Sequence, residues 1–248
     1  MRNKLIIANW KMHGNLQELQ KLSNQICDII TTQQIIILIP FIYITNLAKQ
    51  FLKHKIAIGA QNLAAFTNGA YTGEISASML LDIQCQYVLV GHSERKIYFK
   101  EDNLSLQKKF QLAITHHLKP ILCIGETLSE THEREKILAQ QLDDILQNNI
   151  NLQANQFIIA YEPVWAIGSG KSANIDDLNN VFDILRQYLT KKFSLDFAKK
   201  IKIIYGGSVN SSNIVSLLQQ KNIDGVLIGN ASLKITEFKK ILELIIKY

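Results

Sequence analysis

The sequence predicts an α/β chain folded as a (β/α)₈ barrel, with eight parallel strands and surrounding helices. Short apolar runs rich in β-branched residues alternate with longer amphipathic stretches along the 248 residues. Eight such alternations match this barrel in length and period. The runs are almost continuously apolar, as strands covered on both faces are.

The expected strands follow one another without a nucleotide-binding turn. An open, doubly wound sheet is the structural alternative, and it typically carries G-x-G-x-x-G after its first strand. This chain has Asn9-Trp10-Lys11 there, so the closed barrel is preferred. The strands are expected at Leu5–Asn9, Ile35–Ile39, Ile56–Ala60, Tyr87–Val90, Ile121–Ile124, Phe157–Ala160, Ile201–Tyr205 and Val226–Ile228.

The stretches between these runs carry helix start and stop signals. Asn174 is a candidate N-cap, and Asp176 and Asp177 follow in the first turn, where carboxylates favour the helix dipole. Lys119-Pro120 lies just past the end of another stretch. Because no Pro/Gly-rich linker interrupts the series, we expect one domain over residues 1–248. The clearest helices are expected at Glu101–His117, Asn174–Lys192, Ser211–Gln220 and Ile235–Ile246.

Composition argues against several classes of function. The net charge of +6 comes from 27 Lys and Arg against 21 Asp and Glu, but the lysines are scattered, so we expect no nucleic-acid or membrane partner. The longest apolar runs are far below the roughly 20 residues that span a bilayer. Cys27, Cys85 and Cys123 are lone residues and no signal peptide is recognisable, which predicts a reducing cytoplasm. No His or Cys cluster has metal-ligand spacing, so we expect no metal and no cofactor.

Polar residues gather where the apolar runs end. Strand C-termini form the barrel rim that carries active sites. Gly, Asn and Ser alone could be ordinary turn residues, but Lys11, His92 and Glu162 are not turn formers, so their presence on one rim indicates a site. The clusters are Asn9-Trp10-Lys11, Gln61-Asn62, Gly91-His92-Ser93-Glu94, Gly125-Glu126, Glu162-Pro163, Gly206-Gly207-Ser208 and Gly229-Asn230.

These three side chains favour proton transfer next to a carbonyl. Glu162 is suited to take a carbon-bound proton, His92 to polarise and protonate oxygens, and Lys11 to stabilise the developing negative charge. Each has an ordinary alternative when taken singly: a surface lysine, a satisfied loop histidine, and a helix-cap or ion-paired carboxylate. Their combination favours catalysis.

Two glycine clusters predict a phosphate site. Gly206-Gly207-Ser208 and Gly229-Asn230-Ala231-Ser232 each follow a late strand and are expected to open a helix, where backbone N–H groups bind phosphate. Gly168-Ser169-Gly170-Lys171-Ser172 ends like a nucleotide-binding P-loop, but Trp165 stands where that motif needs its first glycine. We interpret this segment as a hinged lid with a glycine tip.

At this point five motifs together resemble the triosephosphate isomerase family, in order and over essentially the whole chain. Ala70-Tyr71-Thr72-Gly73-Glu74 is similar to the dimer loop of that family. The five motifs are Asn9-Trp10-Lys11-Met12, Gly91-His92-Ser93-Glu94-Arg95, Ala160-Tyr161-Glu162-Pro163-Val164-Trp165-Ala166-Ile167-Gly168, Tyr205-Gly206-Gly207-Ser208-Val209 and Ala231-Ser232-Leu233.

The resemblance implies a TIM-barrel isomerase that interconverts dihydroxyacetone phosphate and D-glyceraldehyde 3-phosphate through an enediolate, in glycolysis and gluconeogenesis. It implies Glu162 as the base and a neutral His92 as the electrophile. Asn9 and Lys11 are implied to bind substrate oxygens, with Glu94 supporting Lys11 from behind. The backbone N–H groups implied to hold phosphate are those of Gly168, Ser208, Gly229 and Asn230.

The resemblance also implies a lid and a homodimer. Closure of Pro163–Ala173 is expected to exclude water and protect the enediolate. Thr72 is implied to reach into the neighbouring subunit's site, with the subunits joined through the Gln61–Ser76 loop. The lid residues are Pro163, Val164, Trp165, Ala166, Ile167, Gly168, Ser169, Gly170 and Lys171.

Two positions depart from the family pattern. Asn230 stands where a second glycine is usual; a positive φ there would add strain of about 1 kcal/mol or a little more, and we expect modestly altered phosphate affinity. Lys96 stands where a second arginine often follows Arg95. Lysine lacks the planar fork of arginine, so we expect an effect on stability or on the interface more than on catalysis.

Three alternatives remain at this point. Another phosphate-binding barrel isomerase or synthase would share the glycine loops but has no reason to carry Lys11, His92 and Glu162 together. A non-catalytic metabolite-binding barrel would tolerate damaged catalytic residues, and none is damaged. A nucleic-acid binder would need a clustered basic patch with aromatic residues, which the sequence lacks.

Overall fold

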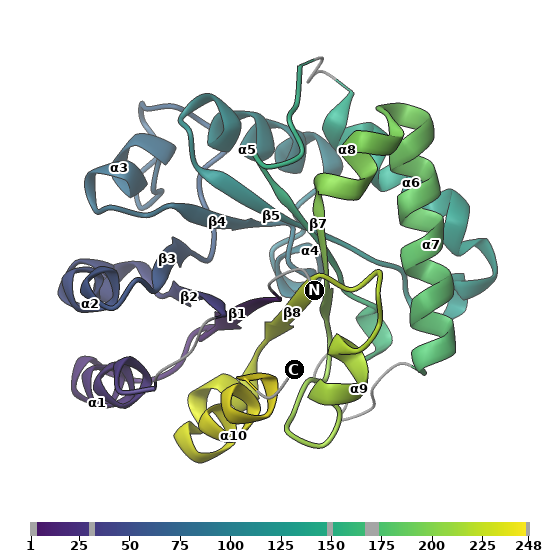
Figure 1. Ribbon diagram of the computed structural model, residues 1–248. Coiled ribbons are helices and arrows are strands. Elements are labelled where there is room, and N and C mark those ends of the chain that lie inside the picture. The colour runs from purple at the N-terminus through teal and green to yellow at the C-terminus, as the bar shows by residue number, and fades with distance from the viewer. Residues whose placement is uncertain (1–3, 30–32, 148–150, 167–173, 247–248) are drawn as a thin grey trace.

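Eight parallel strands close into a barrel that helices surround (Figure 1). The computed structural model describes residues 4–29, 33–147, 151–166 and 174–246. Each strand pairs with the next, and β1 pairs with β8, which confirms the predicted barrel. The strands are β1 (Leu5–Asn9), β2 (Gln34–Ile39), β3 (Ala57–Ala60), β4 (Tyr87–Val90), β5 (Lys119–Ile124), β6 (Ile158–Tyr161), β7 (Lys202–Gly206) and β8 (Gly225–Ile228).

Helices follow the strands and cover the outside of the barrel. The α-helices are α1 (Leu16–Cys27), α2 (Phe41–Lys53), α3 (Ala77–Asp82), α4 (Ser93–Tyr98), α5 (Asn103–Thr115), α6 (Arg134–Leu146), α7 (Ile175–Lys192), α8 (Leu195–Lys200), α9 (Ile214–Leu218) and α10 (Ile235–Ile246). Three short 3₁₀ helices are η1 (Leu128–Glu133), η2 (Val164–Ala166) and η3 (Asn230–Leu233).

The strands lie within one or two residues of their predicted bounds, with one informative difference. Lys119-Pro120 lies past the end of α5 as predicted, but these two residues also open β5, which was expected to begin only at Ile121. The Lys119 N–H donates to the Gln86 carbonyl at 2.9 Å, and Pro120 pairs in register with Val88. Proline is tolerated near the start of a strand, where a missing N–H costs few ladder bonds.

The helix expected at Ser211–Gln220 is shorter, since α9 begins only at Ile214. The Asn210 side chain accepts from the Ser212 N–H at 2.9 Å, and the Asn213 side chain accepts from the Asn210 N–H at 3.0 Å. Such local bonds offer the backbone an alternative to helix. The N-cap expected at Asn174 is confirmed, because its side chain accepts from the Asp176 N–H at 2.8 Å.

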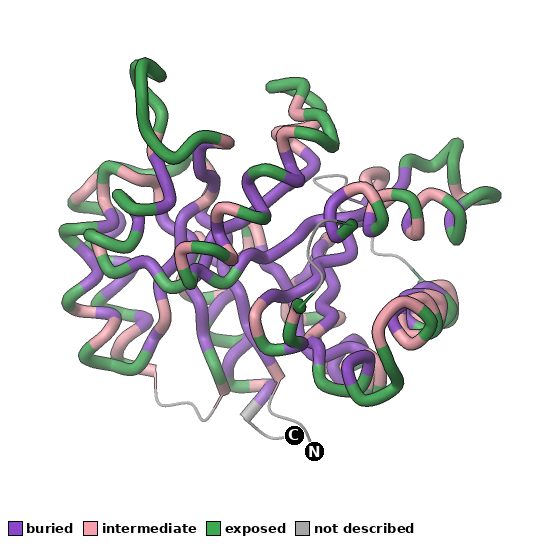
Figure 2. Tube along the Cα trace, turned by 90° about the horizontal axis from the view of Figure 1, so that it is seen from above, coloured by how far each residue is buried: buried purple, intermediate pink, exposed green. Residues whose placement is uncertain are grey.

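Two apolar layers stabilise the barrel. Alternate strand residues point to opposite faces, so Ile7, Leu38 and Ile204 fill the barrel interior while Ile6 and Ile37 pack against the helices. In Figure 2 the buried strands run through the middle, and exposed residues mark the outer helix faces and the loops. This core leaves the strand ends as the place where polar groups can gather.

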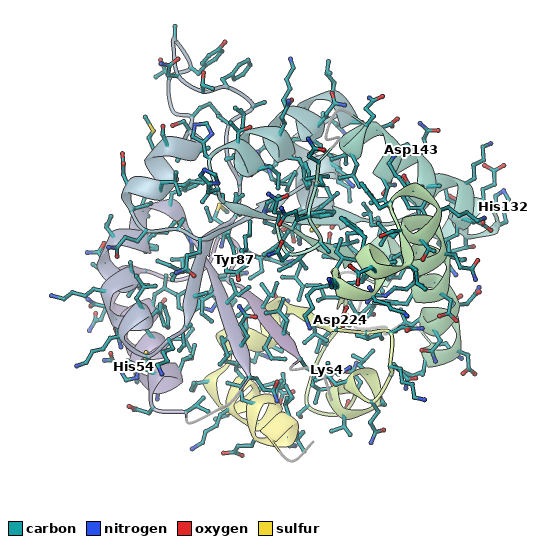
Figure 3. The ribbon with its side chains drawn as sticks, turned by 45° about the horizontal axis from the view of Figure 1, so that its top comes forward. Lys4, His54, Tyr87, His132, Asp143 and Asp224 are labelled. Atoms are coloured by element: carbon teal, nitrogen blue, oxygen red, sulfur yellow. The ribbon has the colours of Figure 1, made fainter. Side chains whose placement is uncertain are left out.

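The N-terminal end of the barrel is held by buried charge. Lys4 and Asp224 lie beside the starts of β1 and β8 (Figure 3). The Asp224 carboxylate accepts from Arg186 Nη2 at 2.5 Å and from the Ile203 N–H at 2.9 Å. The Asp224 side chain is 1% exposed, so solvent screens this pair little.

We expect Asp224→Ala to lower the free energy of unfolding by about 3–5 kcal/mol, because it leaves the Arg186 charge without its buried partner. Urea unfolding followed by circular dichroism at fixed protein concentration measures the loss. Asp196→Ala is the matched control: its ion pair with Lys200 is 73% and 67% exposed, so we expect a change of about 0.5 kcal/mol or less. Equal losses in both variants would contradict the prediction.

Candidate active site

A cleft of about 590 Å³ opens at the carboxyl ends of the strands and brings the predicted polar residues together. This confirms that one rim collects them, as the barrel topology requires. The cleft is lined by Asn9, Lys11, His92, Glu162, Gly206, Gly207, Ser208, Val209, Asn210, Leu227, Gly229, Asn230, Ala231, Lys234, Thr236 and Glu237.

Glu162 follows β6 directly and is 3% exposed. Its backbone N–H donates to the Ile124 carbonyl at 2.7 Å, so the residue is still held by the end of β5. Its carboxylate accepts from the Ser93 N–H at 3.2 Å and lies 3.5 Å from His92 Nε2. The carboxylate is therefore oriented by neutral groups and faces the cleft as a candidate base.

His92 is the N-cap of α4, and its ring is buried. The Glu94 N–H donates to His92 Nδ1 at 3.2 Å, so Nδ1 acts as an acceptor and carries no proton. The Glu94 carboxylate lies 3.6 Å from Nδ1, too far for a competing hydrogen bond. This geometry selects the neutral tautomer with its proton on Nε2, the nitrogen that faces Glu162.

Lys11 adopts a left-handed backbone with φ of 51°, which costs a residue with a side chain about 1 kcal/mol or more. The Asn9 side chain accepts from the Lys11 N–H at 3.0 Å, and Gln61 Nε2 donates to the Lys11 carbonyl at 2.9 Å. Its ammonium pairs with Glu94 at 2.5 Å. The expected support of Lys11 by Glu94 thus corresponds to a direct contact.

Hydrogen bonds that involve side chains hold the loop after β7 in place. Ser208 Oγ donates to the Ala166 carbonyl at 3.0 Å, which joins this loop to the segment after β6. The Ser211 N–H donates to Glu237 at 2.6 Å. The expectation that Gly206-Gly207-Ser208 opens a helix is wrong, because α9 begins six residues after Ser208.

The last loop follows the prediction more closely. Gly229 precedes η3, and Asn230 is its first residue, so the backbone N–H groups there stand at a helix start. Asn230 is not among the described residues with positive φ. Asn230 therefore carries none of the backbone strain that a positive φ would impose at this position.

The remaining expected site residues lie apart from the cleft or outside the described residues. Pro163, Val164, Trp165 and Ala166 are described, and Val164 donates through its N–H to the Glu126 carbonyl at 3.0 Å. Ile167, Gly168, Ser169, Gly170 and Lys171, including the expected phosphate ligand Gly168, lie outside the described residues. Thr72 is exposed in the loop before α3 and does not line the cleft.

Sequence reasoning assigned no role to Glu126, which lies fully buried behind the site. Its carboxylate accepts from Arg134 Nε at 2.8 Å and from the Tyr161 hydroxyl at 2.9 Å. Arg134 in turn makes a bidentate pair with Asp177 at 2.5 and 3.0 Å. Burial, and then the Glu126 charge, raises the pKa of Tyr161. The signal available was a carboxylate close to a strand end, since Glu126 stands two residues after β5 and Glu162 one residue after β6.

Within the described ranges, no group of three His, Cys, Asp or Glu residues is arranged to hold a metal ion. Over the same residues no helix has the length and apolar character needed to cross a membrane. The cleft instead offers a carboxylate, a neutral imidazole N–H and an ammonium beside two glycine-rich loops. Such a set can transfer a proton between carbon and oxygen while an anion is bound nearby.

Comparisons with known proteins agree with this chemistry. The family described as triosephosphate isomerase matches residues 4–245. A triosephosphate isomerase of Legionella pneumophila is 40% identical over 250 residues, covering 99% of this chain and all of the relative. Relatives of the same name from Alkaliphilus oremlandii and Caldanaerobacter subterraneus are each 39% identical over 246 residues, covering 98% of this chain and 99% of theirs.

We expect the Glu237 carboxylate to stabilise the cleft only above acid pH. The bond from the Ser211 N–H lowers the pKa of Glu237 from its ordinary 4.5. A lowered folded-state pKa gives stability that is present above about pH 4.5 and is lost as the pH falls through the folded value. Glu237→Gln should therefore flatten the fall in unfolding free energy between about pH 5 and 3. If the unfolding free energies of wild type and Glu237→Gln fall in parallel as the pH is lowered, the prediction is wrong.

Proposed function

This chain belongs to the triosephosphate isomerase family, and from that membership we propose how its cleft interconverts dihydroxyacetone phosphate and D-glyceraldehyde 3-phosphate. The observation that carries the proposal is the facing pair of Glu162 and His92 Nε2, 3.5 Å apart, in a cleft that also holds Lys11. An isomerisation of this kind needs a base that removes a proton from one carbon and returns it to the next, and an acid that serves the two oxygens.

Glu162 is proposed to take a proton from C1 of dihydroxyacetone phosphate. The C–H electrons form a C1–C2 double bond, and the C2 carbonyl electrons move onto oxygen to give an enediolate. The His92 Nε2–H polarises the carbonyl and moves the proton between the two oxygens. Glu162 then returns its proton to C2, which yields the aldehyde at C1. Protons and electrons balance without any further reactant.

Lys11 and Asn9 are proposed to stabilise the charge on the oxygens. The Lys11 ammonium reaches the cleft while its backbone is held in the left-handed conformation by the Asn9 side chain. Its partner Glu94 sits 38% exposed, so that pair is partly hydrated and can yield when an anionic ligand enters. A charge held in advance costs little reorganisation during the reaction.

The phosphate is proposed to bind the backbone N–H groups of Ser208, Gly229 and Asn230, with Gly168 contributing from the lid. The start of η3 supports this, because helix N-termini attract anions. Pro163–Lys171 is proposed as the lid that excludes water. The bond from Ser208 Oγ to the Ala166 carbonyl supports contact between the lid segment and the phosphate loop.

We also propose that the enzyme is a homodimer joined through the Gln61–Ser76 loop, with Thr72 reaching the partner's site. Exposed apolar side chains on successive loops and helices after β1 to β4 support this, since monomers seldom expose such a series. Within this loop the rings of Phe66 and Tyr71 stack with their centroids 3.8 Å apart. The further exposed side chains are Met12, Ile42, Met79, Leu81, Ile97, Tyr98 and Phe99.

Glycolysis and gluconeogenesis are the proposed pathways, and the cytoplasm is the proposed location. Three free cysteines support a reducing compartment. The basic residues remain scattered over several helices, which supports a small phosphorylated triose rather than nucleic acid as the partner.

Purified wild type should interconvert the two triose phosphates in a coupled assay without added metal or cofactor. Glu162→Ala and Glu162→Gln should lower kcat by on the order of 10²–10⁴-fold, because each removes the base. Glu133→Gln, at an exposed carboxylate on η1, is the matched control and should retain wild-type turnover. A folded wild type without turnover would refute the function, and an active Glu162→Gln would refute the assigned base.

Tyr71→Asp should shift the protein from dimer toward monomer, since it places a charge within the proposed interface. Sedimentation velocity over a range of protein concentrations measures the shift. Leu195→Asp, at an exposed apolar position on α8, is the control and should leave the mass unchanged. A wild type that sediments as a monomer would contradict the proposed assembly.

A further inference from the structure

Lys96 lies on the face of α4 that is turned toward the site. Ser93, one turn earlier on the same face, donates through its N–H to Glu162 at 3.2 Å. Lys96 Nζ donates to the Cys123 carbonyl at 3.1 Å. Its ammonium therefore lies at the end of β5, while the expected effect of Lys96 on stability or on the interface stays a prediction.

The Cys123 carbonyl is placed where the barrel leaves an acceptor free. The pairing of β4 with β5 ends at Val90 with Leu122, one residue before Cys123. Because β4 ends here, it offers no donor to the Cys123 carbonyl, and the Lys96 ammonium donates to it instead. A buried carbonyl needs such a donor. The next carbonyl, of Ile124, accepts from the Glu162 N–H at 2.7 Å. Lys96 and Glu162 thus hold adjacent carbonyls at the end of β5.

The charges around Lys96 point the same way. Burial lowers the pKa of Lys96, while the Cys123 thiol, Glu162 and Glu101 act in the opposite direction. Glu101 already has two cations at 2.5 Å, Arg95 and Lys109. The Glu101 carboxylate is therefore occupied by Arg95 and Lys109, and the hydrogen bond of the Lys96 ammonium goes to the Cys123 carbonyl.

The groups around the Glu162 carboxylate come from the same elements. From α4 and the residue before it they are the Ser93 N–H and the ring of His92; from β5 it is the Cys123 thiol. Lys11, from the β1 loop, lines the same cleft and is paired with Glu94 at 2.5 Å. Burial, and then the Glu162 charge, raises the pKa of the Cys123 thiol, which keeps that thiol neutral.

We propose that Lys96 is a positioning residue for Glu162: its ammonium fixes the end of β5 through the Cys123 carbonyl, next to the Ile124 carbonyl that holds the Glu162 backbone. The inference rests on the proposed function, because it assigns Glu162 the role of base. Removing the ammonium should leave the end of β5, and with it Glu162, less well placed, without touching the substrate.

The test compares Lys96→Met, which removes the charge and the donor, with Lys96→Arg, which keeps both. For Lys96→Met we expect kcat to fall about tenfold or more while KM stays within about twofold. Lys96→Arg should restore kcat to within about threefold of wild type. Lys136→Met, at an exposed lysine on α6, is the matched control and should behave as wild type.

The split between kcat and KM, together with the rescue by arginine, decides the inference. A folded Lys96→Met variant with wild-type kcat overturns it, even if the stability of that variant falls. A Lys96→Arg variant that loses kcat as far as Lys96→Met also overturns it. If Lys96→Met does not fold, Lys96→Leu replaces it. Wild type without turnover would overturn the proposed function, whereas active wild type with unchanged kcat in Lys96→Met overturns only the role of Lys96.

Discussion

Parallel pairing of β1 with β8 is the constraint on which the rest of this structure depends. The two strands pair from Leu5 with Gly225 to Ala8 with Ile228, and this seam turns a sheet into a barrel without free edges. The approach at Gly225 is so close that a Cβ there would meet the Leu5 carbonyl oxygen at 2.1 Å. Closure sends all the strand ends to one rim, and the polar groups of the cleft meet because they follow those ends.

On that rim the start of α4 contacts the side chains of His92, Glu162 and Lys11. Glu94 donates through its backbone to His92 Nδ1 and accepts from the Lys11 ammonium through its carboxylate. One residue therefore selects the tautomer of His92 and anchors the Lys11 ammonium. The Ser93 N–H orients the Glu162 carboxylate from the same turn. His92, Glu162 and Lys11 are thus all held by the start of α4.

The charged groups behind the rim are paired with one another or hydrogen-bonded. The Glu126 and Glu101 carboxylates are 0% and 7% exposed, and they pair with Arg134 and with Arg95 and Lys109. Isolated buried charges are costly, so each of these carboxylates is matched by a cation. The Glu126 pair connects the end of β5 to α6, the Lys96 ammonium connects β5 to α4, and the Glu101 pairs connect α4 to α5.

Local patterns in the sequence predict the barrel, the rim and the placement of Lys11, His92 and Glu162, because continuous apolar runs and polar run-ends can be recognised along the chain. They misplace the start of β5 and the start of α9, which depend on the ladder bond of Lys119 and on the side-chain bonds of Asn210 and Asn213. The inward turn of Lys96, the contacts of Glu126 and the tautomer of His92 are set by the tertiary fold. Those depend on which carbonyl, carboxylate or N–H of a distant element arrives beside each side chain, and no local pattern encodes that.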